Sequence, residues 1–219
     1  PGLQEYLTMG SLNIFKKLQL ELGYDIEFRQ SGSFTAIHTE NQYSYAQSMV
    51  IESQKNAFNL QLLSPYEAKS LEPELNLDLF GYIYSPTRGQ ADPYKTTQAF
   101  SKAALHAGLK VQTTTEVIGI TSSDSVWHVE TNKGKIECEY VVLASGMWSR
   151  QIAAELNVSV PLYPVEHFYI LTEGIKNLEK SLPVLRDYDH CLYIKEDAGK
   201  FLVGIFEPNA KPAFTNTNK

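Results

Sequence analysis

The chain has 219 residues, of which 43% are hydrophobic and 20% are charged, a mixture typical of a globular protein that can bury a core. Its net charge is -6, whereas binding to nucleic acid or to an acidic membrane needs clustered Lys and Arg side chains. The composition therefore favours a small-molecule ligand and argues against nucleic-acid and membrane partners.

The two cysteines, Cys138 and Cys191, lie in no Cys-X-X-Cys motif and near no metal-binding histidine spacing. This predicts neither a disulfide framework nor a metal site, and it favours reduced thiols in the cytoplasm. No stretch reaches the roughly 18 apolar residues of a membrane helix, and the first residues lack the features of a signal peptide. The chain starts with Pro1 rather than Met, so we expect it to be cut from a longer protein.

Apolar residues recur at three- and four-residue steps in the first half of the chain, which predicts helices. The first helix should be kinked at Gly10 and end at Gly23, because glycine weakens or closes a helix. Ser64 with Glu67 forms a capping box, and Asp92 precedes a proline as a further helix start. The predicted helices are residues 3–22, 41–59, 64–72 and 93–107.

Alternating apolar runs bounded by turn residues predict the strands. Asn132-Lys-Gly134 is a hairpin turn, so the runs around it should form an antiparallel meander. His38 would lie on the wet edge of a strand, where we favour a structural over a catalytic role. Residues 208–219 are rich in Pro, Asn and Thr and should form a frayed end. The predicted strands are residues 29–39, 81–85, 109–113, 116–121, 126–131, 135–140, 166–172, 191–196 and 200–205.

One further stretch, residues 140–156, combines a strand buried on both faces, a tight turn and a helix. Its apolar run stops at Ser145 and Gly146, and the periodic segment from Trp148 to Leu156 follows. In open α/β sheets, ligands bind at the carboxyl ends of strands, where the first amides of a helix face an anion. The alternative is an ordinary core strand that enters an ordinary helix.

The order of elements predicts a mixed α+β and α/β fold in which two parts interleave. Residues 86–160 form an α/β part, and residues 1–85 with residues 161–206 form a strand-rich sheet with helices. None of the thirteen glycines completes the GxGxxG motif that opens a dinucleotide-binding domain. We therefore expect the α/β part to be the later half of such a domain, in a fragment that lacks the first βαβ unit.

Six segments together resemble the FAD-dependent amine oxidoreductases of the D-amino-acid oxidase superfamily. Within this superfamily the resemblance is to the dimethylglycine and sarcosine dehydrogenases and dimethylglycine oxidase. The segments are residues 81–93, 115–120, 127–131, 141–149, 164–172 and 182–187.

The resemblance implies a substrate domain made of residues 1–85 and 161–206, interleaved with residues 86–160 as the second half of a Rossmann-like FAD domain, and a tail at 207–219. It implies FAD as cofactor. The expected location is the cytoplasm, or the mitochondrial matrix if the protein is eukaryotic. The family's GxGxxG motif and its FAD-linked His have no counterpart here, so FAD binding by this chain should be weak or absent. A tetrahydrofolate site would belong to a missing carboxy-terminal region.

The resemblance also assigns cofactor contacts. Val117 matches the position whose backbone meets the adenine, although it could equally be a core strand residue. Gly146 and Trp148 match the turn beside the dinucleotide, where a missing Cβ permits close approach.

His167 and Tyr193 match the active-site His and Tyr of dimethylglycine oxidase. Oxidation of a substrate amine requires loss of its ammonium proton, and an imidazole with an ordinary pKa of about 6.5 is a suitable acceptor. We expect the two side chains to line one cavity on neighbouring strands. Arg186 could bind the substrate carboxylate, although we favour an ion pair with Asp187.

The predicted function is oxidative demethylation of an N-methylated glycine, dimethylglycine or sarcosine, by hydride transfer to FAD. The substrate partner would be a small N-methyl amino acid. Two alternatives are oxidation of a different amine by a relative in the same superfamily, and a non-catalytic regulatory role. Surface left exposed by missing segments could drive self-association.

Overall fold

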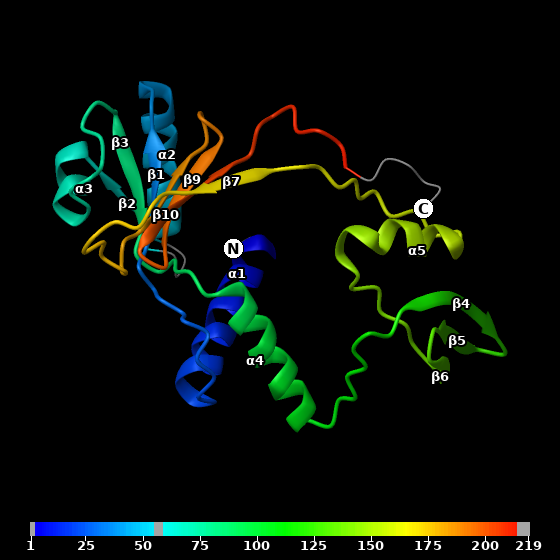
Figure 1. The fold of residues 1–219 in the computed structure, drawn as a ribbon. Coiled ribbons are helices and arrows are strands. Elements are labelled where there is room, and N and C mark those ends of the chain that lie inside the picture. The colour runs from blue at the N-terminus through cyan, green and yellow to red at the C-terminus, as the bar shows by residue number, and fades with distance from the viewer. Residues whose placement is uncertain (1–2, 55–58, 214–219) are drawn as a thin grey trace. The chain divides into compact units, whose positions relative to one another are not determined.

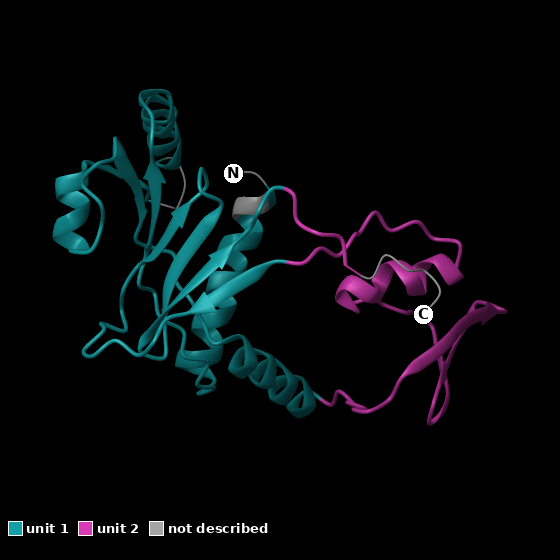
Figure 2. Ribbon diagram, turned by 45° about the horizontal axis from the view of Figure 1, so that its top comes forward, with its two compact units in different colours: residues 1–107, 167–208 teal, residues 108–166, 209–219 magenta. Residues whose placement is uncertain are grey.

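The computed structural model describes residues 3–54 and 59–213. It separates into two compact units, each built from two stretches of chain (Figure 2). Unit 1 contains residues 1–107 and 167–208, and unit 2 contains residues 108–166 and 209–219. The chain passes from unit 1 to unit 2 between residues 107 and 108 and returns between residues 166 and 167. The interleaved parts with boundaries at residues 85–86 and 160–161 stay a prediction. The assignment of these parts to a substrate and an FAD domain stays a prediction.

Unit 1 is organised around a seven-stranded mixed sheet (Figure 1). Strands β1 and β8 are parallel, and every other neighbouring pair is antiparallel. In spatial order the strands are β2 (Gln61–Leu63), β3 (Gly81–Ser85), β1 (Ser33–Ile37), β8 (Val184–Asp187), β9 (Leu192–Asp197), β10 (Lys200–Ile205) and β7 (Phe168–Leu171). Strands far apart in the sequence thus become neighbours, above all β1 and β8.

The helices of unit 1 begin where the sequence supplies capping side chains. Ser64 accepts a hydrogen bond from the backbone amide of Glu67 at 3.3 Å, which confirms the predicted capping box of α3 (Pro65–Leu71). Asp92 accepts one from the amide of Lys95 at 2.7 Å and starts α4 (Pro93–His106). Helix α2 (Glu40–Ser53) is capped by Thr39 and starts one residue before the predicted start at Asn41.

The first helix, α1 (Leu3–Lys16), passes through Gly10 and continues as a π-helical turn, Lys17–Glu21. The helix does end before Gly23, which has the left-handed φ of 69°. The predicted irregularity therefore lies about two to three turns later than Gly10, where the backbone widens into the π-helical turn. The part of the predicted second helix at residues 55–58 lies outside the described residues.

Two apolar clusters form the core of unit 1. In the first, Phe34 of β1 packs edge-on against Tyr82 of β3, with ring centroids 5.8 Å apart, together with Ala68 of α3 and Leu75. The second cluster joins the π-helical turn to α4 and consists of Leu18, Ile26 and Ala99. These side chains are less than 5% exposed, so unit 1 has a closed interior.

Unit 2 holds a three-stranded antiparallel meander and a short helix. Strands β4 (Val117–Ser123), β5 (Val126–Thr131) and β6 (Gly134–Cys138) confirm the predicted meander and its turn at residues 132–134. A 3-10 turn, Gly146–Trp148, leads into α5 (Ser149–Glu155), which confirms the predicted helix of this stretch.

The strand predictions need four corrections. Residues 109–113 and 140–144 form no strand, and the side chain of Val142 is 85% exposed. An apolar run becomes a buried strand only where neighbouring strands accept its backbone hydrogen bonds, and none of the described strands lies beside these residues. Strands β2 and β8 were not predicted, because both are short and carry no clear alternation.

The expected frayed end is only in part unpaired. Residues Val165 and Pro212 form a β-bridge, and the backbone amide of Glu166 donates to the carbonyl of Lys211 at 2.8 Å. Residues 214–219 lie outside the described part of the chain. Within the described residues, no helix combines the length and apolarity needed to cross a membrane.

Candidate active site

The candidate catalytic residues are brought together by strand register in unit 1. Tyr193 of β9 pairs with Arg186 of β8 on one side and with Gly204 of β10 on the other. Paired residues of neighbouring strands project to the same face of a sheet, and so do residues two apart on one strand. The face that carries Tyr193 therefore also carries Arg186 and, beyond β10, Phe206.

Gly204 makes room for the tyrosine. A Cβ atom at this position would lie 2.1 Å from a ring carbon of Tyr193, so only glycine allows the ring to lie flat over β10. The ring of Tyr193 stacks on that of Phe206 at a centroid distance of 5.6 Å. Phe206 in turn meets the ring of His167 edge-on at 5.0 Å. The two predicted catalytic side chains thus flank one aromatic ring.

The expectation that His167 and Tyr193 lie on neighbouring strands is wrong. Strand β10 lies between β7, which His167 precedes, and β9, which carries Tyr193. The tight turn at residues 198–199 pairs β9 with β10 as a hairpin. Strand β7 pairs with the other edge of β10. Phe206 bridges the resulting gap.

The imidazole of His167 is in contact with the carboxylate of Glu207. The Nδ1 atom of His167 lies 3.2 Å from Oε2 of Glu207. A backbone hydrogen bond within Glu207 and this contact with His167 hold the pKa of the Glu207 carboxyl below its ordinary value. An ionised carboxylate only accepts hydrogen bonds, so Nδ1 of His167 is the donor in this contact.

A cavity of about 650 Å³ opens on this face of the sheet. Its lining includes Arg186, Tyr193, Lys195 and Phe206, while His167 contacts Phe206 from outside the lining. The volume lies in the range of small-molecule sites, and cationic and phenolic groups among apolar walls suit an amino acid. Tyr193 therefore lines a ligand-sized cavity directly. His167 contacts this lining through the ring of Phe206.

Arg186 does not form the predicted ion pair with Asp187. Oδ2 of Asp187 lies 2.9 Å from a ring nitrogen of His38 and 2.9 Å from one of His190, and no ion pair joins the described side chains of Arg186 and Asp187. Neighbouring residues on a strand point to opposite faces, which separates the two groups. Burial and the nearby Arg186 lower the pKa of Arg88, although Tyr188 acts in the opposite direction.

The structure also reveals two residues of this site that sequence reasoning missed. Phe206 and Glu207 directly follow β10, at the predicted boundary between residues 161–206 and the tail at residues 207–219. The alternation of Gly204 and Phe206 on one strand face was the available signal. The expected structural role of His38 agrees with its hydrogen bond to Asp187, and His38 belongs to neither the cavity lining nor the contacts of His167.

The candidate cofactor residues belong to unit 2. Gly146 has a φ of 58°, and no atom of the described chain lies within 4 Å of a Cβ built there. Val117 begins β4 and is 43% exposed, and Trp148 is 56% exposed. Open space beside a left-handed glycine, with an exposed indole two residues on, fits a flat ring system or a sugar. The glycine-rich turn that would hold a diphosphate has no counterpart in the 219 residues.

Comparison with known proteins identifies the class. Residues 3–218 match the family model described as DAO, FAD dependent oxidoreductase, so the chain belongs to this family of flavin-dependent oxidoreductases. The family resemblance and the mixed fold predicted from the sequence are thereby confirmed. A solved structure, L-proline dehydrogenase from P. horikoshii, superposes with a TM-score of 0.85 at 26% identity and covers 94% of this chain and 56% of that chain.

Two curated relatives match nearly the whole chain. Mitochondrial dimethylglycine dehydrogenase of Rattus norvegicus is 29% identical over 217 residues, 96% of this chain and 25% of that protein. The mitochondrial pyruvate dehydrogenase phosphatase regulatory subunit of Mus musculus is 31% identical over 221 residues, 98% of this chain and 25% of that protein. The chain thus spans about a quarter of the length of these relatives.

Proposed function

We propose that this chain is the part of a flavin-dependent dehydrogenase or oxidase that binds an N-methylated glycine, dimethylglycine or sarcosine, for oxidative demethylation. The observation that carries the proposal is the sheet face on which Arg186, Tyr193 and Phe206 lie beside a cavity, with His167 against the Phe206 ring and in contact with Glu207. A cation for the carboxylate and a base for the amine are the two groups that an amino-acid substrate requires.

Each side chain has a distinct part in this chemistry. Arg186 binds the substrate carboxylate through its guanidinium fork. Nε2 of His167 accepts the ammonium proton, and Glu207 stabilises the imidazolium that results. The phenol of Tyr193 orients the amine. FAD, if bound, would supply the oxidising power for removal of a hydride from the N-methyl carbon, and hydrolysis of the oxidised amine would release that carbon as formaldehyde.

Val117, Gly146 and Trp148 are the residues of this chain that we expect to contact FAD. They offer main-chain and ring contacts but no diphosphate site, so the 219-residue chain alone should retain little flavin and turn over no amine. The test is to mix the purified chain with FAD, remove free FAD by desalting and record the visible spectrum. A stoichiometric flavin band after desalting would contradict this part of the proposal.

The central experiment uses the flavoprotein that carries these residues together with a complete FAD site. Rapid mixing with dimethylglycine measures flavin reduction. Replacement of His167 by Gln removes the base but keeps its size, so reduction should slow by about 10²- to 10⁴-fold. Tyr193→Phe should cost less, about 1.5–3 kcal/mol, the value of a hydrogen bond to a charged group.

His106→Gln is the matched control, because His106 is exposed and bonds only to the hydroxyl of Tyr24 within the described chain. This variant should reduce its flavin at the wild-type rate. Wild-type reduction in His167→Gln, with an unchanged pH profile, would show that His167 is structural.

Two alternatives have specific support. The relative named L-proline dehydrogenase favours oxidation of a different amine, which a panel of amino acids in the same rapid-mixing experiment distinguishes. The relative named as a phosphatase regulatory subunit favours a non-catalytic role, and failure of every amine to reduce the bound flavin would support it. The pairing of His167 with Glu207 favours catalysis, since a regulatory protein needs no oriented base.

The proposal places the protein in the cytoplasm, or in the mitochondrial matrix of a eukaryote. Any tetrahydrofolate site would lie outside these 219 residues. Self-association of the isolated chain through its exposed apolar surface is also part of the proposal, and gel filtration over a range of concentrations tests it.

A further inference from the structure

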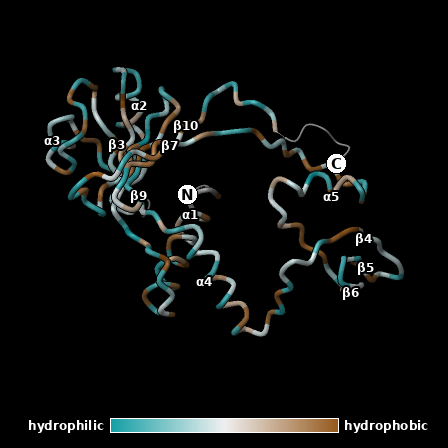
Figure 3. Tube along the Cα trace, in the orientation of Figure 1, coloured by the Kyte–Doolittle hydropathy of each residue, from teal (hydrophilic) through white to brown (hydrophobic). Residues whose placement is uncertain are grey.

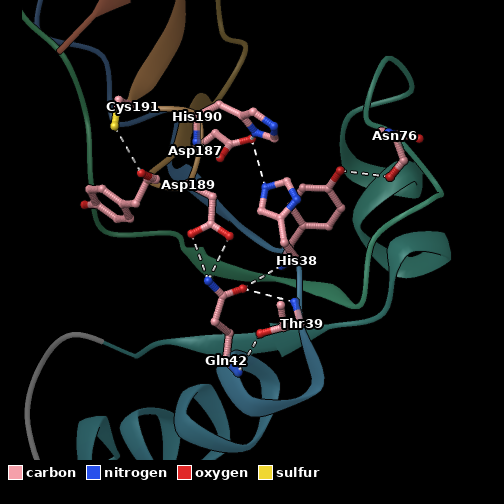
Figure 4. Close-up of polar contacts among 10 residues, drawn as sticks. His38, Thr39, Gln42, Asn76, Asp187, Asp189, His190 and Cys191 are labelled. Carbon is pink, nitrogen blue, oxygen red and sulfur yellow. Dashed lines mark hydrogen bonds and ion pairs between the residues drawn. The ribbon is translucent and has the colours of Figure 1, made fainter. Parts of the chain in front are cut away.

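Three potential ligand side chains converge at the end of β8, and one of them, Asp187, also lines the cavity described above (Figure 4). His38 follows β1, Asp187 ends β8, and His190 lies in the turn between β8 and β9. Oδ2 of Asp187 lies 2.9 Å from Nε2 of His38 and 2.9 Å from Nδ1 of His190. One ligand atom from each of the three residues lies within 4.8 Å of the others, which defines the His38–Asp187–His190 cluster.

The backbone around the cluster is held in place by hydrogen bonds of its own. Because β1 and β8 are parallel, their carboxyl ends reach the same edge of the sheet and bring His38 to Asp187. The side-chain oxygen of Gln42 in α2 accepts a hydrogen bond of 2.8 Å from the backbone amide of His38. The side-chain nitrogen of Gln42 donates to both carboxylate oxygens of Asp189, at 2.9 and 3.0 Å. The amide of His190 donates to Oδ1 of Asp187 at 3.0 Å, which leaves Oδ2 for the two imidazoles.

The exposure of the three side chains differs in a way that suits a bound ion. The side chains of Asp187 and His38 are 14% and 20% exposed, whereas that of His190 is 64% exposed. Two ligands are therefore fixed in the protein surface, and the third stands at its rim. A metal ion held by all three would keep one side open to water.

We propose that His38, Asp187 and His190 form a binding site for one divalent transition-metal ion of the zinc type, with water as the fourth ligand. Two imidazoles and one carboxylate match the ligands of this class of ion, whereas Mg²⁺ and Ca²⁺ prefer oxygen ligands. Metal–ligand bonds of about 2.0–2.2 Å place tetrahedral ligands roughly 3.3–3.5 Å apart. The present nitrogen–oxygen distances of 2.9 Å need to open only slightly to reach this spacing. This site does not depend on the proposed amine oxidation.

The experiment uses the 219-residue chain after treatment with a chelator. Calorimetric titration with Zn²⁺ should show one equivalent bound, and Co²⁺ at the same site should give visible absorption bands typical of tetrahedral coordination. His190→Ala removes a ligand from an exposed position and leaves the interior intact. Its zinc affinity should fall by more than the about 10- to 100-fold that loss of an outer-shell partner costs.

Two further variants sharpen the test. Asp187→Asn should also lose zinc binding and the Co²⁺ bands, whereas His106→Ala, which replaces an exposed histidine outside the cluster, should keep the wild-type affinity. Zn²⁺ should raise the melting temperature of the wild-type chain but not that of His190→Ala, because an ion bound only to the folded state stabilises it. Failure to bind one equivalent of Zn²⁺, or equal affinity in wild type and His190→Ala, would leave the cluster as a hydrogen-bonded support of the turn and overturn the proposal.

Discussion

The two units differ in how far their apolar side chains are buried. Unit 1 buries large residues completely, among them Ile26, Phe34 and Tyr82, each at 1% exposure or less. Among the described residues of unit 2, only Thr131 and Ala153 are buried, although hydrophobic residues recur along β4 and on either side of α5 (Figure 3). Apolar groups left in water contribute nothing to folding, so unit 1 should carry the stability of this chain.

This difference also separates the proposed roles. The substrate face lies in unit 1, where a closed core can hold His167, Tyr193 and Arg186 in fixed positions. The candidate cofactor residues lie in unit 2, whose exposed apolar side chains suit a surface that is completed by other segments. Single substitutions should therefore act strongly in unit 1 and weakly in unit 2. The two tryptophans, Trp127 and Trp148, both lie in unit 2, so their fluorescence reports on that unit alone.

The largest effect is expected for Phe34→Ala. The ring of Phe34 is fully buried between Tyr82 and Tyr84, with centroid distances of 5.8 and 4.8 Å. Loss of a buried phenylalanine ring should destabilise unit 1 by about 3–5 kcal/mol. Hydrogen exchange of peptides from β1 and β3, followed by mass spectrometry, measures this loss. Unchanged exchange there would mean that the core of unit 1 does not support its sheet.

A smaller loss is expected for Glu196→Gln. The Glu196 side chain is 1% exposed and forms an ion pair of 2.7 Å with Arg29, whose side chain is 30% exposed. Because the remaining Arg29 can still reach water, the cost should be about 2–3 kcal/mol in a urea titration followed by hydrogen exchange of unit 1. The neighbouring Asp197→Asn is the control, because Asp197 is 45% exposed and its ion pair with Lys195 is long, at 4.0 Å. Equal costs for the two variants would refute the importance of the buried pair.

In unit 2, Gly146→Ala should cost about 1–2 kcal/mol, because its φ of 58° strains any residue with a Cβ. Fluorescence of the adjacent Trp148 measures the change during unfolding. Gly10→Ala is the comparison, because Gly10 lies inside α1 and has no positive φ. This substitution should stabilise the helix by about 0.5–1 kcal/mol. The same sign for both substitutions would contradict the backbone conformation at Gly146.

The smallest effect is expected for Val142→Ser. Val142 is 85% exposed, so its replacement should change the free energy of unfolding by no more than about 0.5 kcal/mol. Val184→Ser in unit 1 is the matched substitution, and because Val184 is 9% exposed it should cost about 1–3 kcal/mol. A cost above about 1 kcal/mol for Val142→Ser would show that this side chain is covered in solution, and gel filtration would then identify self-association.

Local chemistry was sufficient to predict much of the secondary structure. The capping box of Ser64 and Glu67, the Asp92 cap and the turn at residues 132–134 each depend on contacts within about four residues, so a sequence pattern specifies them completely. The strand at residues 140–144 was predicted on equally good local grounds and does not form. Its apolar pattern describes what the segment can do, whereas strand formation depends on partners that the described chain does not place beside it.

The candidate site was only half predictable. His167 and Tyr193 were found through the family resemblance, and their roles stay a prediction. Glu207, which orients His167, escaped because its 40-residue separation from His167 leaves no local signal.

The sequence by itself determined where helices and hairpins begin, and it supplied the family, because these depend on short segments read one at a time. Only the tertiary structure decided which side chains meet. His38 and Asp187 are 149 residues apart, and the parallel pairing of β1 with β8 brings them to one edge of the sheet. The pairing of distant strands depends on the free energy of the whole sheet, and no pattern within either segment encodes it.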